Sequence, residues 1–327
     1  MKAITIIAIL GALAATYMIF NANTDNSEMM ERYQKYVAEF GKSYNSAEEF
    51  NFRFQIFSDN VKIIDAHNAQ ESTFTMGVNN FADWTNEEYR RLLGYDPIPY
   101  KCEDTVCKSS SKSSVDWVQG GAVTAVQNQG ACGSCWAFGT VGAIEGAHFK
   151  TTGELLKFSE QQFVDCCSDL CYGCNGGFQN KAIQWAENND LCLESEYKYT
   201  GRQGTCKQTQ CTKTYHTVNR CHSVCPYTVD ALKAALEIEP VSVTVDAGSS
   251  AFQFYSSGIL ESTSCGTALN HAVLGVGYGT DYITIKNSWG TGWGDNGYIM
   301  ISTKNTSPYP KEGICGIFMD NSYADSD

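Results

Sequence analysis

The chain has 327 residues, which is longer than one average domain, so we expect two packed lobes or a precursor that is processed. It carries 23 basic and 36 acidic residues, and the formal charge of −13 argues against binding to nucleic acid or to an anionic membrane. Hydrophobic residues make up 43% and charged residues 18%, a composition typical of a globular core and not of a disordered chain.

The N-terminus begins with a basic residue and continues as an apolar stretch. Lys2 precedes a run over residues 3–20, and polar residues follow it from Asn21 to Thr24. This order predicts a signal peptide over residues 1–20. An N-terminal anchor helix is the alternative, because the run is near the shortest length that spans a bilayer. The single Lys and the lack of a later hydrophobic span favour secretion, and 15 cysteines fit an oxidising compartment.

Amphipathic helices follow the predicted signal peptide. A first helix is expected over residues 28–40, and a second begins at Ser46, where Glu49 completes a capping box. Thr85 and Glu88 cap a further short helix that ends near Gly94. Apolar residues of the second helix recur at steps of four and three and form one stripe: Phe50, Phe54, Phe57, Val61 and Ile64.

The next segment, residues 96–114, is rich in Ser, Lys and Pro and predicts a linker in which an activation cleavage falls. Helical signals dominate from about residue 122 to 221. One helix is expected from Cys135 to Thr151, and another begins at a capping box formed by Ser159 and Gln162. Strand patterns dominate after about residue 226, at residues 241–245, 271–277 and 282–286.

The run from Gln129 to Phe138 reads Gln-Gly-Ala-Cys-Gly-Ser-Cys-Trp-Ala-Phe and places Cys135 at the start of a helix. Unsatisfied N–H groups and the positive end of the helix dipole favour a thiolate there. Taken alone, Cys132 and Cys135 also fit a redox pair, half of a zinc site or two structural disulfide cysteines. His271 lies far downstream on an apolar, Gly-spaced strand, and Asn287 follows the next strand.

These residues together resemble the papain family of cysteine proteases. The Cys-Gly-Ser-Cys-Trp sequence and a His about 130–150 residues after the Cys, followed by an Asn, are the family's signature. The resemblance covers nearly the whole chain and is closest to cathepsin L-like proenzymes. It implies an α+β fold in which an active-site cleft lies between a helical lobe and a β-barrel-like lobe, preceded by a helical propeptide.

The resemblance also implies how the chain is divided. We expect the signal peptide at 1–20, an inhibitory propeptide at 21–110 and the mature papain-like peptidase at 111–327. The sequence Val115-Asp116-Trp117 is similar to the start of mature enzymes in the family. Two propeptide motifs of the cathepsin L-like group are matched residue by residue: Glu49, Arg53, Phe57, Asn60, Ile64 and Asn68, and then Gly77, Asn79, Phe81 and Asp83.

In the catalytic roles that the resemblance implies, Cys135 is the nucleophile and His271 the acid and base. His271 as imidazolium, with the helix terminus, should lower the pKa of the thiol by several units. Asn287 orients the imidazole, although an Asn-Ser pair is also common in surface turns. Trp289 shields that hydrogen bond, and Gln129 forms the oxyanion hole with the Cys135 N–H. No metal and no organic cofactor is expected.

Substrate binding is expected along the cleft. Gly176, Gly177 and Phe178 match the strip that pairs with the substrate backbone, although a Gly-Gly pair could also be a simple turn. The walls of the main specificity pocket are expected at Phe178, Gln179, Thr244 and Leu269. Asp320 falls at the floor of this pocket, or else it is a solvated carboxylate in a polar tail. If it lines the pocket, the enzyme accepts both Arg and bulky apolar side chains.

The resemblance implies three disulfides, Cys132–Cys174, Cys166–Cys206 and Cys265–Cys315, and leaves Cys135 as the free thiol. Cysteines close together near residue 170 could instead bind zinc, but a secretory signal favours disulfides. Asn305 begins the one glycosylation sequon. Eight further cysteines allow 105 pairings, which the sequence does not resolve: Cys102, Cys107, Cys167, Cys171, Cys192, Cys211, Cys221 and Cys225.

The sequence therefore predicts a cysteine endopeptidase, made as an autoinhibited precursor and activated in acid. The endopeptidase choice depends on the lack of a His-containing insertion between Cys174 and His271. Expected partners are protein and peptide substrates, the chain's own propeptide and cystatin-type inhibitors, with a monomeric mature enzyme and no nucleic acid. The chain is expected to enter the secretory pathway and reach a lysosome, vacuole, phagosome or the cell exterior.

Two rival functions come from other classes of protein. A catalytically silent homologue could serve as a binding protein, but the presence of Cys135, His271, Asn287 and Gln129 argues against it. A thiol–disulfide oxidoreductase could use Cys132 and Cys135, but the propeptide motifs and the downstream His and Asn argue against that.

Overall fold

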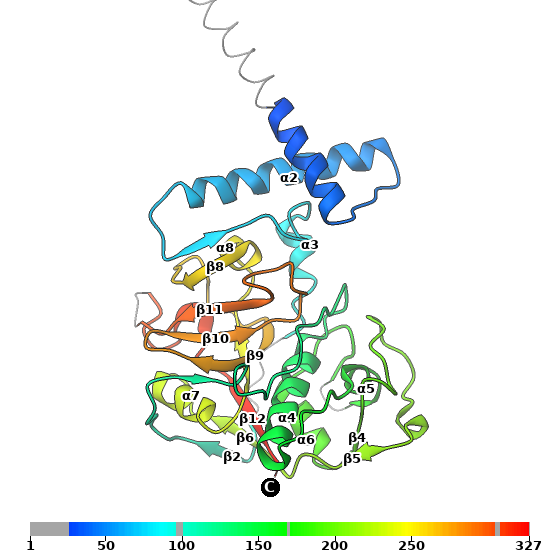
Figure 1. The fold of residues 1–327 in the computed structure, drawn as a ribbon, viewed down its shortest axis with the longest axis vertical. Helices are drawn as coiled ribbons and strands as arrows, with labels where there is room; N and C mark the ends of the chain where they lie inside the picture. Colours follow the sequence, from blue (N-terminus) through cyan, green and yellow to red (C-terminus); the bar gives the residue numbers. More distant parts are fainter. Residues whose placement is uncertain (1–25, 96–100, 169–170, 305–307, 327) are drawn as a thin grey trace, which may run out of the picture.

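The computed structural model describes residues 26–95, 101–168, 171–304 and 308–326 (Figure 1). The predicted signal peptide and the sequon at Asn305 lie outside these residues. Within the described part of the chain, no helix combines the length and the hydrophobicity that crossing a bilayer requires.

Two crossing helices form a cap at one end of the molecule (Figure 1). Residues 26–39 are helical, and α2 (Ala47–Asn68) begins at Ser46, whose side chain accepts a hydrogen bond from the Glu49 N–H. Phe54, Phe57 and Val61 of the apolar stripe of α2 meet Tyr33 and Tyr36 in a small separate core, and Ile64 packs into the main core. Farther along, α3 (Asn86–Arg90) begins at a complete capping box of Thr85 and Glu88.

The helical lobe is built around α4 (Cys135–Thr152), which is buried along most of its length and ends at Gly153 in the left-handed conformation, with φ of 76°. Its partners are α5 (Glu160–Cys166) and α6 (Gln179–Ala186). Ser159 caps α5 by accepting from the Gln162 N–H. The Gln162 side chain does not complete the expected capping box.

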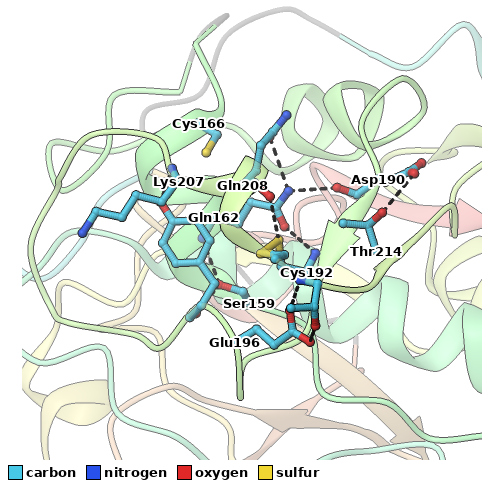
Figure 2. Close-up of a disulfide and its surroundings, with 12 residues drawn as sticks. Ser159, Gln162, Cys166, Asp190, Cys192, Glu196, Lys207, Gln208 and Thr214 are labelled. Atoms are coloured by element: carbon cyan, nitrogen blue, oxygen red, sulfur yellow. Dashed lines mark hydrogen bonds between the residues drawn. A yellow bond between two sulfur atoms is a disulfide. The ribbon is translucent and has the colours of Figure 1, made fainter.

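Gln162 instead fixes the outer loop of this lobe (Figure 2). Its amide accepts from the Cys192 N–H at 2.7 Å and donates to the Asp190 carbonyl at 2.9 Å. These bonds hold β4 (Leu191–Cys192), which pairs with β5 (Thr214–Tyr215), and the Cys192–Cys211 disulfide closes the loop between them. Only a short 3-10 turn, η1 (Gln208–Gln210), interrupts it.

The β-rich lobe is one ten-stranded sheet with the order β1-β8-β11-β10-β9-β7-β12-β6-β2, and β3 pairs with β9. The predicted strands at 241–245 and 282–286 are β7 and β10, and the strand at 271–277 extends one residue further as β9. The sheet's core contains Val243, Phe252 and Ile285. The other elements are β1 (Phe74–Met76), β2 (Asp104–Val106), β3 (Val115–Asp116), β6 (Arg220–Val224), α7 (Val229–Leu236), β7 (Val241–Val245), α8 (Ser250–Gln253), β8 (Tyr255–Leu260), β9 (His271–Tyr278), β10 (Tyr282–Lys286), β11 (Tyr298–Ser302), η2 (Ile314–Gly316) and β12 (Asn321–Asp325).

Two segments before residue 111 belong to this sheet. The strand β1 of the expected propeptide pairs with β8, and β2 pairs with β6 at the opposite end of the sheet order. The interpretation of residues 96–114 as only a polar linker is therefore wrong, because an edge strand lies inside it. The composition hides this strand because edge strands tolerate polar side chains.

Seven disulfides cross-link the described residues, and Cys135 is the free cysteine among them. The three expected pairs are present. The cysteines near residue 170 are in disulfides, so the zinc alternative has no free ligands there. The four further pairs are Cys102–Cys221, Cys107–Cys225, Cys167–Cys171 and Cys192–Cys211.

Candidate active site

The buried thiol of Cys135 is at the first residue of α4, where the helix meets β9. Its sulfur interacts with the backbone N–H groups of Ala272, Gly94 and Trp136. Ala272 is the second residue of β9 and follows His271 directly. Cys135 is the first residue of α4 and His271 is the first residue of β9, so the packing of this helix on this strand places the two residues near each other.

The orientation of His271 is fixed by its neighbours on β10 and beyond. Nε2 of His271 lies 2.8 Å from Oδ1 of Asn287, which comes directly after β10. That oxygen also accepts from the Ser288 N–H at 2.8 Å, so the imidazole donates from Nε2. In the neutral ring the lone pair is then on Nδ1, which is buried and has no hydrogen-bond partner among the described residues.

Trp289 covers this pair. Its ring stacks on the imidazole of His271 with 4.6 Å between centroids and 23° between planes, and it is 1% exposed. Asn287 is 2% exposed. A hydrogen bond that water cannot reach is stronger than an exposed one, so Trp289 stabilises the orientation of the ring.

Gln129 holds a fixed amide beside the start of α4. Its Oε1 accepts from the Ser288 hydroxyl at 2.7 Å, which leaves Nε2 to donate. Nε2 lies 2.9 Å from the carbonyl oxygen of Cys132 and 2.9 Å from that of Leu92. The amide that the sequence assigns to the oxyanion hole therefore faces the carbonyl of Leu92, a residue of the expected propeptide.

The backbone after Leu92 continues along the cleft and touches both lobes. The Gly94 carbonyl accepts from the Gly177 N–H at 3.1 Å, and the Tyr95 N–H donates to the Asn270 carbonyl at 3.1 Å. A Cβ on Gly94 would lie 2.0 Å from the carbonyl oxygen of Gly133, so only glycine fits. Sequence reasoning missed the cleft contacts of Leu92, Gly94, Tyr95 and Asn270, and noted Gly94 only as the end of a helix.

Tyr95 contacts two of the residues expected at the substrate strip and in the specificity pocket, Phe178 and Asp320. Its hydroxyl donates to the Asp320 carboxylate, and its ring meets that of Phe178 edge-on at 5.8 Å. The backbone carbonyl of Asp320 accepts from the Thr244 hydroxyl and from the Gln179 amide at 3.4 Å. Leu269 is 4% exposed, and a Cβ on Gly176 would lie 3.0 Å from the Gly94 carbonyl.

Burial sets the charge states in this closed form. It raises the pKa of the Cys135 thiol, and it lowers the pKa of His271 to about 4 although the Asn287 hydrogen bond opposes the shift. The expectation of a lowered thiol pKa is therefore wrong for the form with residues 92–95 in the cleft. The physical reason is that desolvation disfavours both charged forms, so the pair is a neutral thiol and a neutral imidazole.

A metal centre has no support in the part of the chain that the structure describes, where no three His, Cys, Asp or Glu side chains are grouped to hold an ion.

Two family models match the chain. The model of the papain family cysteine protease matches residues 111–324, and that of the cathepsin propeptide inhibitor domain (I29) matches residues 33–89. The chain belongs to the papain family. This confirms the resemblance found in the sequence, and with it a cysteine-type endopeptidase that carries a propeptide inhibitor domain.

Individual relatives agree with the family. Papain from Carica papaya is 37% identical over 311 residues, which cover 93% of this chain and 89% of papain. The cysteine proteinase RD21A from Arabidopsis thaliana is 39% identical over 91% of this chain, which spans 66% of that relative's length. The structure of a recombinant stem bromelain precursor superposes with a TM-score of 0.83 at 34% identity, over 92% of this chain and 99% of the precursor. The α+β papain-like fold is thus confirmed.

Proposed function

We propose that this papain-family endopeptidase hydrolyses peptide bonds through Cys135 and His271, and that it is made as a precursor whose residues 92–95 block the cleft. The observation that carries the proposal is the imidazole of His271. Asn287 holds the ring through its Nε2, and the ring's Nδ1 has no partner among the described residues. The ring is buried in the same site as the free cysteine, Cys135.

In the proposed mechanism, Nδ1 of His271 takes the thiol proton, and the Cys135 thiolate attacks the substrate carbonyl. His271 then protonates the leaving amine, and afterwards it removes a proton from the water that hydrolyses the thioester. The Gln129 amide and the Cys135 N–H stabilise the oxyanion, and one such donor contributes about 3–4 kcal/mol. Asn287 keeps the imidazole in the orientation that these transfers need.

Residues 92–95 support the autoinhibition. They occupy the Gln129 amide, the Gly177 N–H and the Asn270 carbonyl, three groups that a substrate backbone would use. From the division that the sequence predicts, we keep the order of parts as a proposal: a signal peptide at 1–20, an inhibitory propeptide after it and a peptidase that extends to residue 327. We also propose the secretory pathway as the route, ending in a lysosome, vacuole, phagosome or outside the cell.

Two groups support activation in acid. His271 has a pKa of about 4 in the closed form against an ordinary value of 6.5. Above pH 6.5 the imidazole is neutral in any form, so the closed form loses no stability to protonation. As the pH falls from 6.5 towards 4, protonation of the imidazole increasingly disfavours the closed form, which is less stable as a result. Burial raises the pKa of Glu88, but hydrogen bonds from Arg53 and Thr85 outweigh it and hold the pKa below 4.5. The stabilising charge of Glu88 is therefore lost only below that pH.

The precursor should process itself at an increasing rate as the pH falls from 6.5 towards 4, and Cys135→Ala should not process. The ion pair between Arg53 of α2 and Glu88 of α3, 2.7 Å long, joins these two helices. Glu88→Gln removes this ion pair. We expect this variant to process at higher pH than the wild type. The rate is measured by mass spectrometry of timed samples at each pH.

The matched control is Glu87→Gln. Glu87 pairs with Arg91 at 3.4 Å, and both side chains are more than two thirds exposed, so the pair contributes little. Identical pH profiles for Glu88→Gln and Glu87→Gln would contradict the role of the half-buried pair of Arg53 and Glu88. Maturation of Cys135→Ala at the wild-type rate would contradict self-processing.

For specificity, we propose that Asp320 lies at the floor of the pocket that Tyr95 fills. A substrate Arg there would make a charged hydrogen bond worth about 1.5–3 kcal/mol, which is about a ten- to hundredfold gain in kcat/KM. Asp320→Ala should therefore lower the ratio of kcat/KM for Arg over Leu by that factor. Because burial raises the pKa of Asp320, the preference for Arg should increase with pH.

The control is Asp325→Asn, which changes the carboxylate at the end of β12, one that pairs with His222 at 3.4 Å. It should leave the Arg/Leu ratio unchanged. An unchanged ratio in Asp320→Ala as well would show that Asp320 does not face the substrate.

A further inference from the structure

Two disulfides join the segment before residue 111 to the body of the peptidase. Cys102 pairs with Cys221 and Cys107 pairs with Cys225, across 119 and 118 residues of sequence. Cys102 is 3% and Cys221 is 1% exposed, so the first bridge lies inside the protein. Both partners come from β6 or the residue directly after it.

The residues between these cysteines form part of the peptidase sheet. The strand β2 pairs in parallel with β6 (Figure 1). In this pairing Thr105 lies opposite Ser223. The Cys102 N–H donates to the Ser223 hydroxyl at 2.9 Å, and the Cys225 N–H donates to the Val106 carbonyl at 3.0 Å. Hydrogen bonds therefore hold the strand at both ends, in addition to the disulfides.

The chain after β2 is bound to the same body. The Glu237 carboxylate accepts from the Ser111 N–H at 2.6 Å and from the Lys112 N–H at 2.7 Å. The Tyr278 hydroxyl donates to Glu237 at 2.8 Å. These contacts fasten residues 111 and 112 to the end of α7 and to β9, and β3 begins three residues later.

We propose that residues 102–112, with β2 as their edge strand, remain part of the mature enzyme, and that the cut that frees the propeptide lies on the N-terminal side of Cys102. The sequence predicts the border at residues 110 and 111, and the family model begins at residue 111. This inference rests on the proposed activation by cleavage, and it adds which residues are released with the propeptide and which stay on the peptidase.

A cut between Cys107 and Ser111 would not release the inhibitor. The propeptide would stay joined to the peptidase through two disulfides, at the millimolar effective concentration that a short tether gives, so the cleft would stay filled. Losing the 102–107 peptide as well would require two disulfides to be reduced in an oxidising compartment, and it would uncover the edge of β6.

The tether is tested without any enzymatic activity. In the Cys135→Ser precursor, residues 108–110 are replaced by the recognition site of a sequence-specific protease, and the protein is cut there. The cut protein should run as one species on a denaturing gel without reductant and as two with it. Control variants that replace one cysteine of each bridge, Cys102→Ser with Cys107→Ser, should separate without reductant.

The retained strand is tested on the wild type. The acid-activated enzyme is sequenced from its N-terminus and digested without reduction, and the peptide that joins Cys102 to Cys221 is sought by mass spectrometry. We expect an N-terminus before Cys102 and an intact bridge. An active enzyme without residues 102–107 would overturn the inference, as would a cut precursor that separates without reductant. A precursor that never activates would contradict only the proposed function.

Discussion

Replacing Cys135 by Ser or His271 by Ala should each abolish measurable turnover, whereas Asn287→Ala should keep part of it. The reason is that Cys135 forms the covalent bond and His271 moves the proton, while Asn287 only orients the ring through one hydrogen bond of 2.8 Å. The double variant Cys135→Ser with His271→Ala should cost little more than either single change, because residues that act as a unit are not additive.

The measurement is kcat on a small peptide substrate after every precursor has been cut by the same added protease, which is then removed, because the Cys135 and His271 variants should not process themselves. His148→Ala is the matched control, because His148 lies on α4 and contacts Phe158 and Tyr215, away from the cleft. It should retain activity. Losses in kcat that add up in the double variant would mean that Cys135 or His271 has been given the wrong role.

Gly94→Val should make the uncut precursor active at neutral pH. The Cβ of a Val at position 94 would lie 2.0 Å from the carbonyl oxygen of Gly133. This contact is with backbone, which cannot move aside as a flexible side chain could. The segment would then lose its bonds to Gly177 and Asn270 and the contact of Tyr95 with Asp320. Three contacts at about 1 kcal/mol each amount to about 3 kcal/mol, so we expect about a hundredfold increase in initial rate over the wild-type precursor.

Gly41→Asn is the control within the same region. Gly41 has φ of 60°, a Cβ added to it would have no atom within 4 Å, and Asn tolerates this conformation. This variant should stay as inactive as the wild type. If the Gly94→Val precursor folds, with an unchanged melting temperature of the peptidase, and remains inactive, then residues 92–95 are not what blocks the cleft.

The elements with strong local signals could be predicted from the sequence. The stripe of α2 and the Gly that ends α4 are examples, because period and caps depend only on neighbouring residues. The strand β2 could not be predicted. It is polar, and its stability comes from β6 and from two disulfides whose partners lie 118 and 119 residues away.

The candidate site divides in the same way. Cys135, His271 and Asn287 could be named from a motif and its spacing, and the structure brings them to one place. The contacts of Leu92, Gly94 and Tyr95 depend on the tertiary path of the chain, which no local pattern encodes. The direction of the Cys135 pKa shift was missed for the same reason, since a helix terminus is visible in the sequence and burial under another segment is not.

The most direct test of the account is covalent labelling by an epoxide inhibitor such as E-64, followed by mass spectrometry of the intact and digested protein. The acid-activated enzyme should take up one equivalent, located on Cys135, and the uncut precursor at neutral pH should take up none because residues 92–95 cover the thiol. Labelling of another cysteine, or equally fast labelling of Cys135 in the uncut precursor, would contradict the account.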